Sequence, residues 1–314
     1  MEPGYLALAV SGELARRAER ARKLLAACRL CPRRCGVDRL QDELGFCGAG
    51  ARAGVASYHL HFGEEGPLVG ETGSGTIFFS GCNLGCVFCQ NADISQSRDG
   101  GVEAEPEELA GAMLDLARQG AANINLVTPT HVVPQILEAL CVAAEHGLRL
   151  PLVYNSSGYD DAQTLRLLDG VVDIYMPDVK IWEPDQAARL LSAEDYPQRA
   201  RAAVLEMHRQ AGDLQVAEDG LARRGLLVRH LVMPARLAGT ESWVHFLAEN
   251  VSLETCVHVM AQYRPCHRAR DFADIARAIT NDEFREALDA ARRRGLRRLL
   301  GRGESFWRLI TAGL

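Results

Sequence analysis

The sequence predicts an α/β fold in which parallel strands and helices alternate. From residue 76 onward, six short apolar segments have the character of buried strands, at 76–80, 123–127, 151–155, 171–176, 226–231 and 256–260. Helical stretches separate them, at roughly 106–119, 133–146, 161–169, 185–212 and 240–249. Mostly apolar strands are typical of parallel sheets, and the alternation indicates six βα units around such a sheet. Six units are too few for a complete eight-stranded barrel.

The segments on either side of this region have a different character. Leu14, Ala18 and Ala21 recur at helical spacing and predict an amphipathic N-terminal helix that leads into a cysteine-rich loop. The stretch from Val55 to Thr72 is strand-like but broken by glycines, which suggests a connecting ribbon. Residues 271–300 favour one or two closing helices. We therefore expect an N-terminal extension at 1–72, the βα region at 73–269 and a C-terminal helical extension at 270–314.

The composition is that of an ordinary globular protein. The 314 residues are 47% hydrophobic and 24% charged. Apolar runs of about 18 or more are absent, and the first ten residues carry no basic segment, so we expect neither a membrane span nor a signal peptide. A cytoplasmic location is therefore predicted. In that reducing compartment the ten cysteines indicate metal or redox sites before disulfides.

The net charge of −6 argues against a broadly basic surface for nucleic acid. One exception is a C-terminal cluster of six arginines, at positions 292, 293, 294, 297, 298 and 302. We interpret it as the solvated face of a helix. Contact with RNA or with an acidic partner is the alternative.

Three cysteines directly after the first predicted strand form the most specific motif of the chain. Cys82, Cys86 and Cys89 have the spacing C-x3-C-x2-C. Three thiolates can hold three irons of a cubane [4Fe–4S] cluster, and with no fourth cysteine close by one iron stays open for chemistry. A zinc loop with a distant fourth ligand, or buried structural cysteines, are the alternatives. Structural zinc favours paired motifs of similar spacing, so we favour the cluster.

A second cysteine group lies near the N-terminus. Cys28, Cys31, Cys35 and Cys47 have the spacing C-x2-C-x3-C-x11-C. Four thiolates would saturate a zinc ion or an iron–sulfur cluster, which makes this site structural or electron-relaying. The sequence does not choose between the metals, and a reduced loop without metal is the alternative.

Polar residues follow the later predicted strands. In barrels of parallel strands the reactive groups lie at the carboxyl ends of the strands, so we expect these side chains to converge. Threonine hydroxyls at 128 and 130 could accept hydrogen bonds from an ammonium group, although Thr130 could instead cap the next helix. Lys180 could hold a carboxylate or could be a plain surface lysine.

The cysteine triplet, with the aromatic Phe88 before its third cysteine, resembles the radical S-adenosylmethionine (SAM) superfamily. The resemblance covers most of the chain from Thr76 to Ala269. It implies an open, partial (β/α)6 barrel of the TIM type, here with an N-terminal cysteine-rich extension. It also implies that the open iron binds SAM and that SAM is cleaved reductively to a 5′-deoxyadenosyl radical.

A narrower resemblance concerns uncharacterised homologues of the pyruvate formate-lyase activating enzyme. It is carried by the N-terminal cysteines, by Gln90-Asn91 and by Asp178-Val179-Lys180. It implies hydrogen abstraction from a glycine of a glycyl-radical enzyme, with an electron donor such as flavodoxin or ferredoxin. A radical SAM enzyme acting on a small molecule or RNA, and a non-catalytic iron–sulfur or zinc scaffold, are the alternatives.

The resemblance also implies site residues. The glycine-rich segment that usually holds the SAM amino group is replaced by Thr128-Pro129-Thr130-His131, and Lys180 is expected near the SAM carboxylate. Cys266 could be a catalytic hydrogen donor, with packing as its alternative. The residues expected to bind the cofactor are Phe88, Asn91, Thr128, Thr130, Asn155, Ser157, Asp178, Lys180, Arg229 and Arg264.

Overall fold

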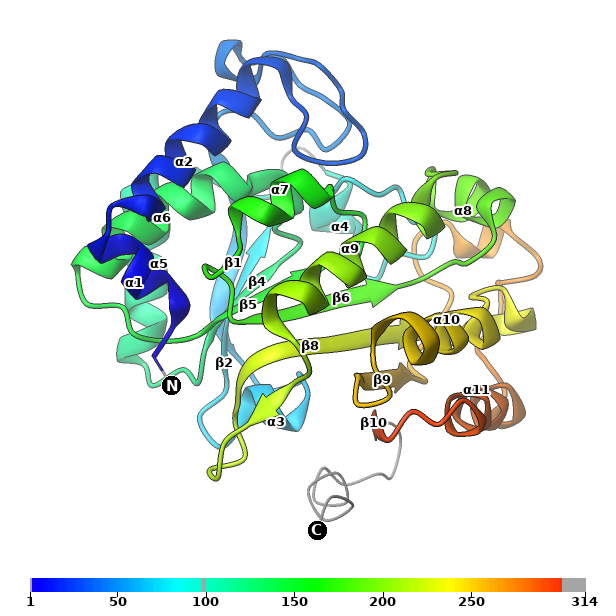
Figure 1. The fold of residues 1–314 in the computed structure, drawn as a ribbon. Helices are drawn as coiled ribbons and strands as arrows, with labels where there is room; N and C mark the ends of the chain where they lie inside the picture. Colours follow the sequence, from blue (N-terminus) through cyan, green and yellow to red (C-terminus); the bar gives the residue numbers. More distant parts are fainter. Residues whose placement is uncertain (1, 98–99, 301–314) are drawn as a thin grey trace.

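One ten-stranded sheet organises the chain in the computed structural model, which describes residues 2–97 and 100–300 (Figure 1). The spatial order is β10-β9-β8-β6-β5-β4-β2-β1-β3, and β7 pairs with β8 off this path. The strands are β1 (Ala53–His61), β2 (Ser74–Phe79), β3 (Val102–Ala104), β4 (Ile124–Val127), β5 (Leu152–Ser156), β6 (Ile174–Val179), β7 (Gln215–Val216), β8 (Ala222–Leu231), β9 (Cys256–Met260) and β10 (Arg298–Leu300).

All six predicted strands are present, as β2, β4, β5, β6, β8 and β9, and each pairs in parallel with its neighbours along this order. The predicted α/β fold with a parallel central sheet is therefore confirmed. In the described residues β10 and β3 end the sheet at opposite edges and do not pair with each other, so the sheet is an open barrel.

Two flanking segments also join this sheet, one predicted as a strand-like ribbon and the other as closing helices. The expected ribbon forms β1, which pairs antiparallel with both β2 and β3. The expected closing helices end in β10, which pairs in parallel with β9. β10 lies at the sheet edge and gains its hydrogen bonds from β9, which is distant in sequence, so its local pattern carries little signal. The predicted boundaries of the βα region, after residues 72 and 269, remain a prediction.

The helices cover the sheet much as predicted. Their bounds are α1 (Gly4–Val10), α2 (Glu13–Lys23), α3 (Gly66–Val69), α4 (Ala92–Ser95), α5 (Pro106–Arg118), α6 (Val133–Glu145), α7 (Ala162–Leu167), α8 (Pro184–Leu191), α9 (Tyr196–Ala211), α10 (Thr240–Phe246) and α11 (Asn281–Arg293). The predicted helix 185–212 is two helices, because Ser192 adopts a left-handed conformation at φ 56° and ends α8.

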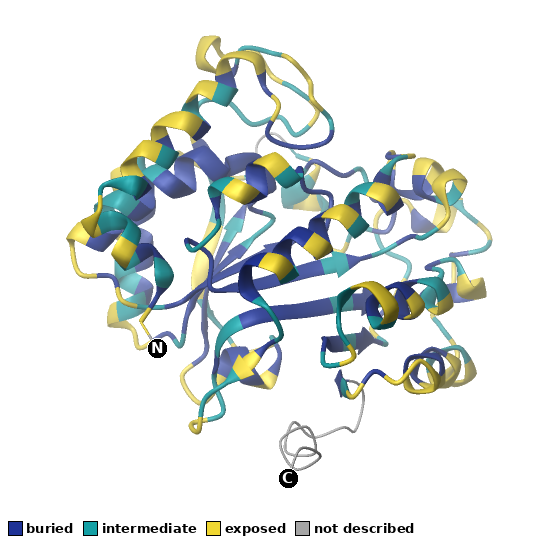
Figure 2. Cartoon of the chain, in the orientation of Figure 1, coloured by how far each residue is buried: buried dark blue, intermediate teal, exposed yellow. Residues whose placement is uncertain are grey.

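The two faces of the sheet pack differently. Figure 2 shows the parallel strands as the most deeply buried part of the chain. Side chains on one face, such as Ile77 and Leu126, pack in the large core beneath the helices. On the other face Val153, Leu227 and Cys256 form a smaller apolar cluster with Leu68 of α3. That cluster fills the barrel interior near the amino ends of the strands. Polar groups nearer the carboxyl ends of the strands therefore face the other end of the barrel.

The N-terminal helices bring the cysteine-rich loop to the barrel. Tyr5 donates its hydroxyl to the Leu150 carbonyl at 3.1 Å, and Arg22 pairs with Glu138 of α6 at 3.1 Å. Figure 1 shows α2 running along α6 toward the dark blue loop that follows it. The loop therefore lies at a fixed place beside the barrel.

Several of the C-terminal arginines make ion pairs within the chain. Arg293 and Arg294 both lie near Glu241, at 3.4 and 3.3 Å, and Arg297 pairs with Glu254 at 2.7 Å. Arg302 lies outside the described residues. None of the described helices has both the length and the apolar character needed to cross a membrane.

The buried His230 in β8 makes the stability of the fold depend on pH. Its ring is buried, Nδ1 donates to the Val179 carbonyl at 2.9 Å, and Nε2 accepts from the Thr240 hydroxyl at 2.8 Å. Burial lowers the pKa of His230 to about 4. An unfolded histidine binds its proton near pH 6.5, so stability falls as pH drops from about 6.5 toward 4 and levels off below that.

We therefore expect His230→Asn, which cannot titrate, to lose about 2–3 kcal/mol less free energy of unfolding than the parent between neutral and acid pH. Urea unfolding of both proteins near pH 7.5 and near pH 4.5 measures this difference. Equal losses in the two proteins would contradict the assignment.

Candidate functional site

The loop that carries the cysteine triplet leaves the carboxyl end of β2 and is fixed by backbone hydrogen bonds. Gly85 N and Val87 N donate to carbonyls at the end of α8, at 3.0 and 2.9 Å. The Val87 carbonyl in turn accepts from Arg268 N at 2.9 Å, and Gly81 N donates to the Ile94 carbonyl at 2.9 Å. The loop is thus tied to three other segments, which fixes the positions of its cysteines.

The three cysteines are free thiols with hydrogen-bond donors nearby. Cys86 is buried, whereas Cys82 and Cys89 are partly exposed. Leu84 N donates to Cys82 Sγ at 3.4 Å, and the Ser95 hydroxyl lies 3.1 Å from Cys89 Sγ. Burial raises the pKa of Cys82 to about 11. Bound iron would replace these protons, because the thiolate is the ligand form.

Lys180 supplies positive charge beside this loop. Its Nζ lies 2.6 Å from Asp178 Oδ2, and its side chain is 14% exposed. Burial lowers the pKa of Lys180, but the nearby Asp178 carboxylate and Cys86 thiol outweigh burial and keep the pKa above its usual value. A permanent cation therefore faces the cysteine loop from the end of β6. This charge fits an anionic cluster in the loop.

Tyr196, which the sequence analysis missed, joins the ends of β5 and β6. Its buried hydroxyl accepts from Lys180 N at 3.0 Å and lies within hydrogen-bond distance of the Asp178 carbonyl at 2.8 Å and the Ser157 carbonyl at 3.0 Å. Ser157 Oγ also lies 3.5 Å from Asn83 Oδ1 of the cysteine loop. Tyr196 comes from α9, far along the chain, so no local pattern pointed to this contact.

The threonines after β4 lie in different surroundings. Thr128 has φ 60°, and its backbone N–H donates to the Asn155 carbonyl at 2.9 Å. Thr130 is buried and donates its hydroxyl to Asp160 at 2.7 Å. It does not cap the following helix, because Val132 is the N-cap of α6. Its predicted role in SAM binding stays a prediction.

Asp160 is the centre of this buried polar network. It also accepts from Tyr154 at 2.9 Å and from Ser156 at 2.7 Å. Burial raises the pKa of Asp160, and the three hydroxyl donors oppose that rise. The network fixes the loops after β4 and β5 to each other. Asp160 lies beyond the strand end itself, and the sequence analysis did not single it out.

Arg229 lies inside the barrel with acidic partners. Its guanidinium pairs with Glu64 and, at 2.8 and 2.6 Å, with both oxygens of Glu65. His258 Nδ1 lies 2.6 Å from Glu65 as well. Burial raises the pKa of Glu65, but Arg229 and His258 outweigh it and hold the pKa well below its usual value. The Arg229 side chain, 14% exposed, is therefore already matched by carboxylates.

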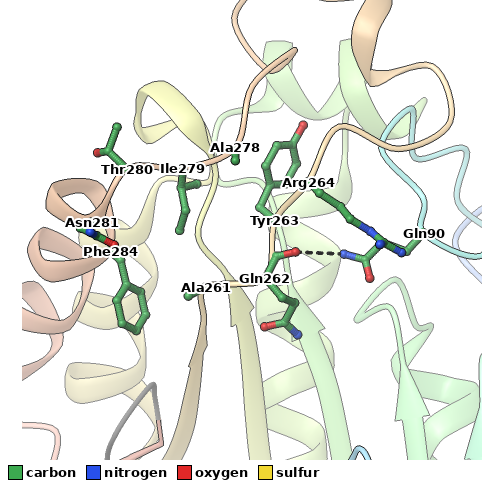
Figure 3. A pocket seen from close by; sticks show the side chains of 10 residues that line it. All are labelled: Gln90, Ala261, Gln262, Tyr263, Arg264, Ala278, Ile279, Thr280, Asn281 and Phe284. Carbon is green, nitrogen blue, oxygen red and sulfur yellow. Dashed lines mark hydrogen bonds between the residues drawn. The ribbon is translucent and has the colours of Figure 1, made fainter.

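A pocket of about 400 Å³ opens beside the cysteine loop, between Gln90, the segment after β9 and the start of α11 (Figure 3). Gln90 Nε2 donates to the Gln262 carbonyl at 3.5 Å, and Arg264 extends along the same wall. The volume lies in the range of small-molecule sites. Arg264 therefore lies on the wall of this pocket.

The remaining predicted residues surround this region. Phe88 is buried with its ring 6.1 Å from that of Tyr263, and Asn91 is exposed at the N-cap of α4. Asn155 is buried at the end of β5. Cys266 is partly buried in the turn after β9, where its carbonyl accepts from Ala269 N at 2.9 Å.

The four N-terminal cysteines, Cys28, Cys31, Cys35 and Cys47, line a single cavity next to this site. Among the described residues, no three His, Cys, Asp or Glu side chains are arranged to hold one metal ion. Asn83 of the cysteine loop lines the same cavity. The two cysteine groups are therefore neighbours, a relation that the sequence analysis did not predict.

Comparisons with known proteins found a family model, a relative and a solved structure that are similar to this chain. The family model of the radical SAM superfamily matches residues 76–217. The uncharacterized protein MJ0674 of Methanocaldococcus jannaschii is 34% identical over 287 residues, which is 88% of this chain and 78% of that protein. The structure of TYW1 with a lysine-pyruvate adduct bound aligns with 69% of this chain and 73% of that chain, at 9% identity and a TM-score of 0.43.

Gly81 provides a test of how the loop is held. It has φ 77°, and a Cβ atom there would lie 2.3 Å from the Cys47 carbonyl oxygen. Gly81→Ala should therefore lower the free energy of unfolding by at least about 1–2 kcal/mol. Gly111→Ala is the matched control, because Gly111 is exposed on α5 with no neighbour within 4 Å. Urea unfolding should show no loss in the control. Equal stability of the two variants would refute the close contact.

Proposed function

This chain belongs to the radical SAM superfamily, and we propose that it cleaves SAM reductively at a [4Fe–4S] cluster held by Cys82, Cys86 and Cys89. The observation that carries the proposal is three free cysteines on one fixed loop at the carboxyl end of β2, with polar strand ends beside them. A cluster of this kind supplies one electron to SAM, and the resulting 5′-deoxyadenosyl radical abstracts a hydrogen atom.

The residues of this chain fit such a group. Donors at Leu84 N and Ser95 Oγ lie within reach of the cysteine sulfurs, and the Lys180 cation balances negative charge. Lys180 would also attract the SAM carboxylate, since an ammonium is a compact donor for that group. Thr128, Asn155, Ser157 and Asp178 lie at the adjoining strand ends, where their polar atoms would position the rest of the cofactor.

For the substrate, we propose a glycine of a glycyl-radical enzyme, from which the radical would take a hydrogen atom. The resemblance to homologues of the pyruvate formate-lyase activating enzyme supports this proposal. A small-molecule substrate is the second candidate, and the 400 Å³ pocket beside Gln90 favours it. Hydrogen–deuterium exchange separates the two candidates. Exchange into a glycine of an added partner would support the first, and exchange into a small product would support the second.

The proposal requires an electron donor, for which flavodoxin or ferredoxin are the expected classes. We also propose a cytoplasmic location, which the ten free cysteines support. The four N-terminal cysteines would hold a second metal. Phe88, Asn91, Arg229 and Arg264 remain proposed cofactor contacts, and Cys266 a proposed hydrogen donor.

The first test concerns the cluster. We expect replacement of Cys82, Cys86 and Cys89 by alanine to abolish 5′-deoxyadenosine formation and the SAM-sensitive electron paramagnetic resonance signal, because the iron ligands are gone. The readout is anaerobic reconstitution with iron, sulfide and SAM, followed by product analysis. Replacement of Cys256, which is buried in the smaller core, controls for the loss of a cysteine elsewhere. Continued 5′-deoxyadenosine formation in the triple variant would exclude the proposed site.

The second test concerns Lys180. Loss of a charged hydrogen bond costs about 1.5–3 kcal/mol, so Lys180→Ala should weaken SAM binding by about 10- to 100-fold. Lys23→Ala is the control, because Lys23 is exposed on α2 and, among the described residues, forms an ion pair with the exposed Glu19. Equilibrium binding of SAM to the reconstituted proteins measures the effect. Equal affinities for SAM in the two variants would show that Lys180 pairs with Asp178 but does not bind SAM.

A further inference from the structure

The barrel interior contains a connected layer of polar side chains. Its members come from the loop after β1 and from β4, β8 and β9, and we call them the interior layer: Glu64, Glu65, Asn125, Arg229 and His258. Asn125 Nδ2 donates to Glu64 Oε1 at 3.2 Å, and Arg229 pairs with both glutamates. His258 Nδ1 lies 2.6 Å from Glu65 Oε1. These contacts join four separate segments of the chain into one polar unit.

Asn125 brings to this layer a hydrogen-bond acceptor that has no donor. Its neighbours Ile124 and Leu126 pack in the large core beneath the helices, so Asn125 points to the opposite face, which is the barrel interior. The residue is 0% exposed, and its Oδ1 atom makes no hydrogen bond within residues 2–97 and 100–300. The Glu64 carboxylate fixes the orientation of the amide, because only Nδ2 can donate to it. A buried acceptor of this kind requires a donor.

The interior layer also carries more negative than positive charge. The side chains of Glu64 and Glu65 are 7% and 2% exposed, and among the described residues Arg229 is the one guanidinium that pairs with them. His258 contacts Glu65, and His61 Nδ1 lies 3.2 Å from Glu64 Oε1 without forming a hydrogen bond. With both histidines neutral, two carboxylates face a single cation. Buried carboxylates are stable only beside positive charge, so the layer favours a ligand group that is both a donor and a cation.

The interior layer is closed on one side and open on the other. Leu68, Val153 and Leu227 are fully buried and fill the barrel at the amino ends of the strands. The His258 side chain nevertheless stays 27% exposed. Solvent therefore reaches the layer from the carboxyl ends of the strands, where the cysteine loop lies. Asn125 comes two residues before the end of β4, which is roughly 7 Å along the strand, so a small molecule is long enough to extend from the layer to the strand ends.

We propose that the interior layer binds the primary ammonium group of a small-molecule substrate, with Asn125 Oδ1 and the Glu64 carboxylate as its acceptors. An ammonium group has three N–H donors and one positive charge. It therefore supplies the donor that the amide oxygen lacks and the charge that the two carboxylates lack. The rest of the molecule would extend towards the carboxyl ends of the strands. The role as a substrate site rests on the proposed function and on its small-molecule candidate, whereas the binding of an ammonium group does not.

Binding is tested in the full chain purified without added iron or SAM, so that the result does not depend on a cluster. The probes are n-butylammonium, which has the charge and the donors, tetramethylammonium, which has the charge without N–H donors, and 1-butanol, which has a donor without the charge. We expect n-butylammonium to shift the NMR resonances of the His258 ring saturably, with an affinity at least about tenfold above that of the other two probes. Equal affinities, or no saturable shift, would overturn the proposal.

Two variants locate the ammonium group in the layer. Asn125→Leu keeps the size of the side chain and removes the acceptor, and Glu64→Gln removes one negative charge with little change of shape. Each should weaken n-butylammonium binding by at least about tenfold. Asn250→Leu and Glu249→Gln, at exposed positions, are the matched controls and should bind as the parent does. Circular dichroism checks folding, and if one variant does not fold the other remains the test. Unchanged binding in a folded Asn125→Leu or Glu64→Gln variant would refute the assignment of these acceptors.

SAM itself carries an ammonium group, and SAM binding separates the two sources of this chemistry. In the reconstituted protein we expect Asn125→Leu to bind SAM with the parent affinity, because Asn125 lies deeper in the barrel than Thr128, which follows the same strand. Equilibrium binding of SAM measures this. A loss of SAM affinity of about tenfold or more would show that the layer holds the cofactor and would overturn the substrate assignment. No 5′-deoxyadenosine from the parent would contradict the proposed function, and with it the substrate role, but not the binding of an ammonium group.

Discussion

The close contact between Gly81 and the Cys47 carbonyl is the constraint on which the rest of the site depends. The chain must leave β2 with φ 77° at Gly81 and pass under that carbonyl without a side chain. Cys82 and Asn83 follow immediately. This short segment therefore carries a cysteine of the triplet and also lines the cavity of the N-terminal cysteines. The N-terminal extension therefore packs directly against the loop of the triplet.

Charge balance connects the two cysteine groups to the barrel. Lys180 faces one group, and Arg33 and Arg39 line the cavity of the other. In the described residues only Lys180 among these has a carboxylate partner, Asp178. Burial favours neutral thiols, as the raised pKa of Cys31, about 12, illustrates. A bound metal would keep the cysteines in the thiolate form. Their negative charge would then balance the positive charge of the neighbouring lysine and arginines.

The barrel interior determines which end is open for chemistry. Val153, Leu227 and Leu68 fill it near the start of the strands, and Arg229 with Glu64 and Glu65 forms a polar layer above them. Apolar packing thus seals one end, while the strand ends at Asn155 and Asp178 stay polar. Tyr196 then joins two of these ends through one hydroxyl. The polar groups at the strand ends are in this way held in place by packing.

The sequence by itself determined the parallel strands and the triplet. Each parallel strand is a local apolar run, and Cys82, Cys86 and Cys89 lie on one loop whose spacing is fixed by the chain, so both can be recognised without knowing distant neighbours. The placement of Lys180 at the end of β6 followed from the same strand pattern.

Tertiary structure decided the rest. β10 became a strand only through pairing with β9, and the Thr130 hydroxyl donates to Asp160 while Val132 caps α6. Tyr196 and Arg39 gained their partners from segments far away in the sequence. A hydrogen bond or a charge contact depends on distance in space, and a local pattern carries no information about which distant group will come within reach.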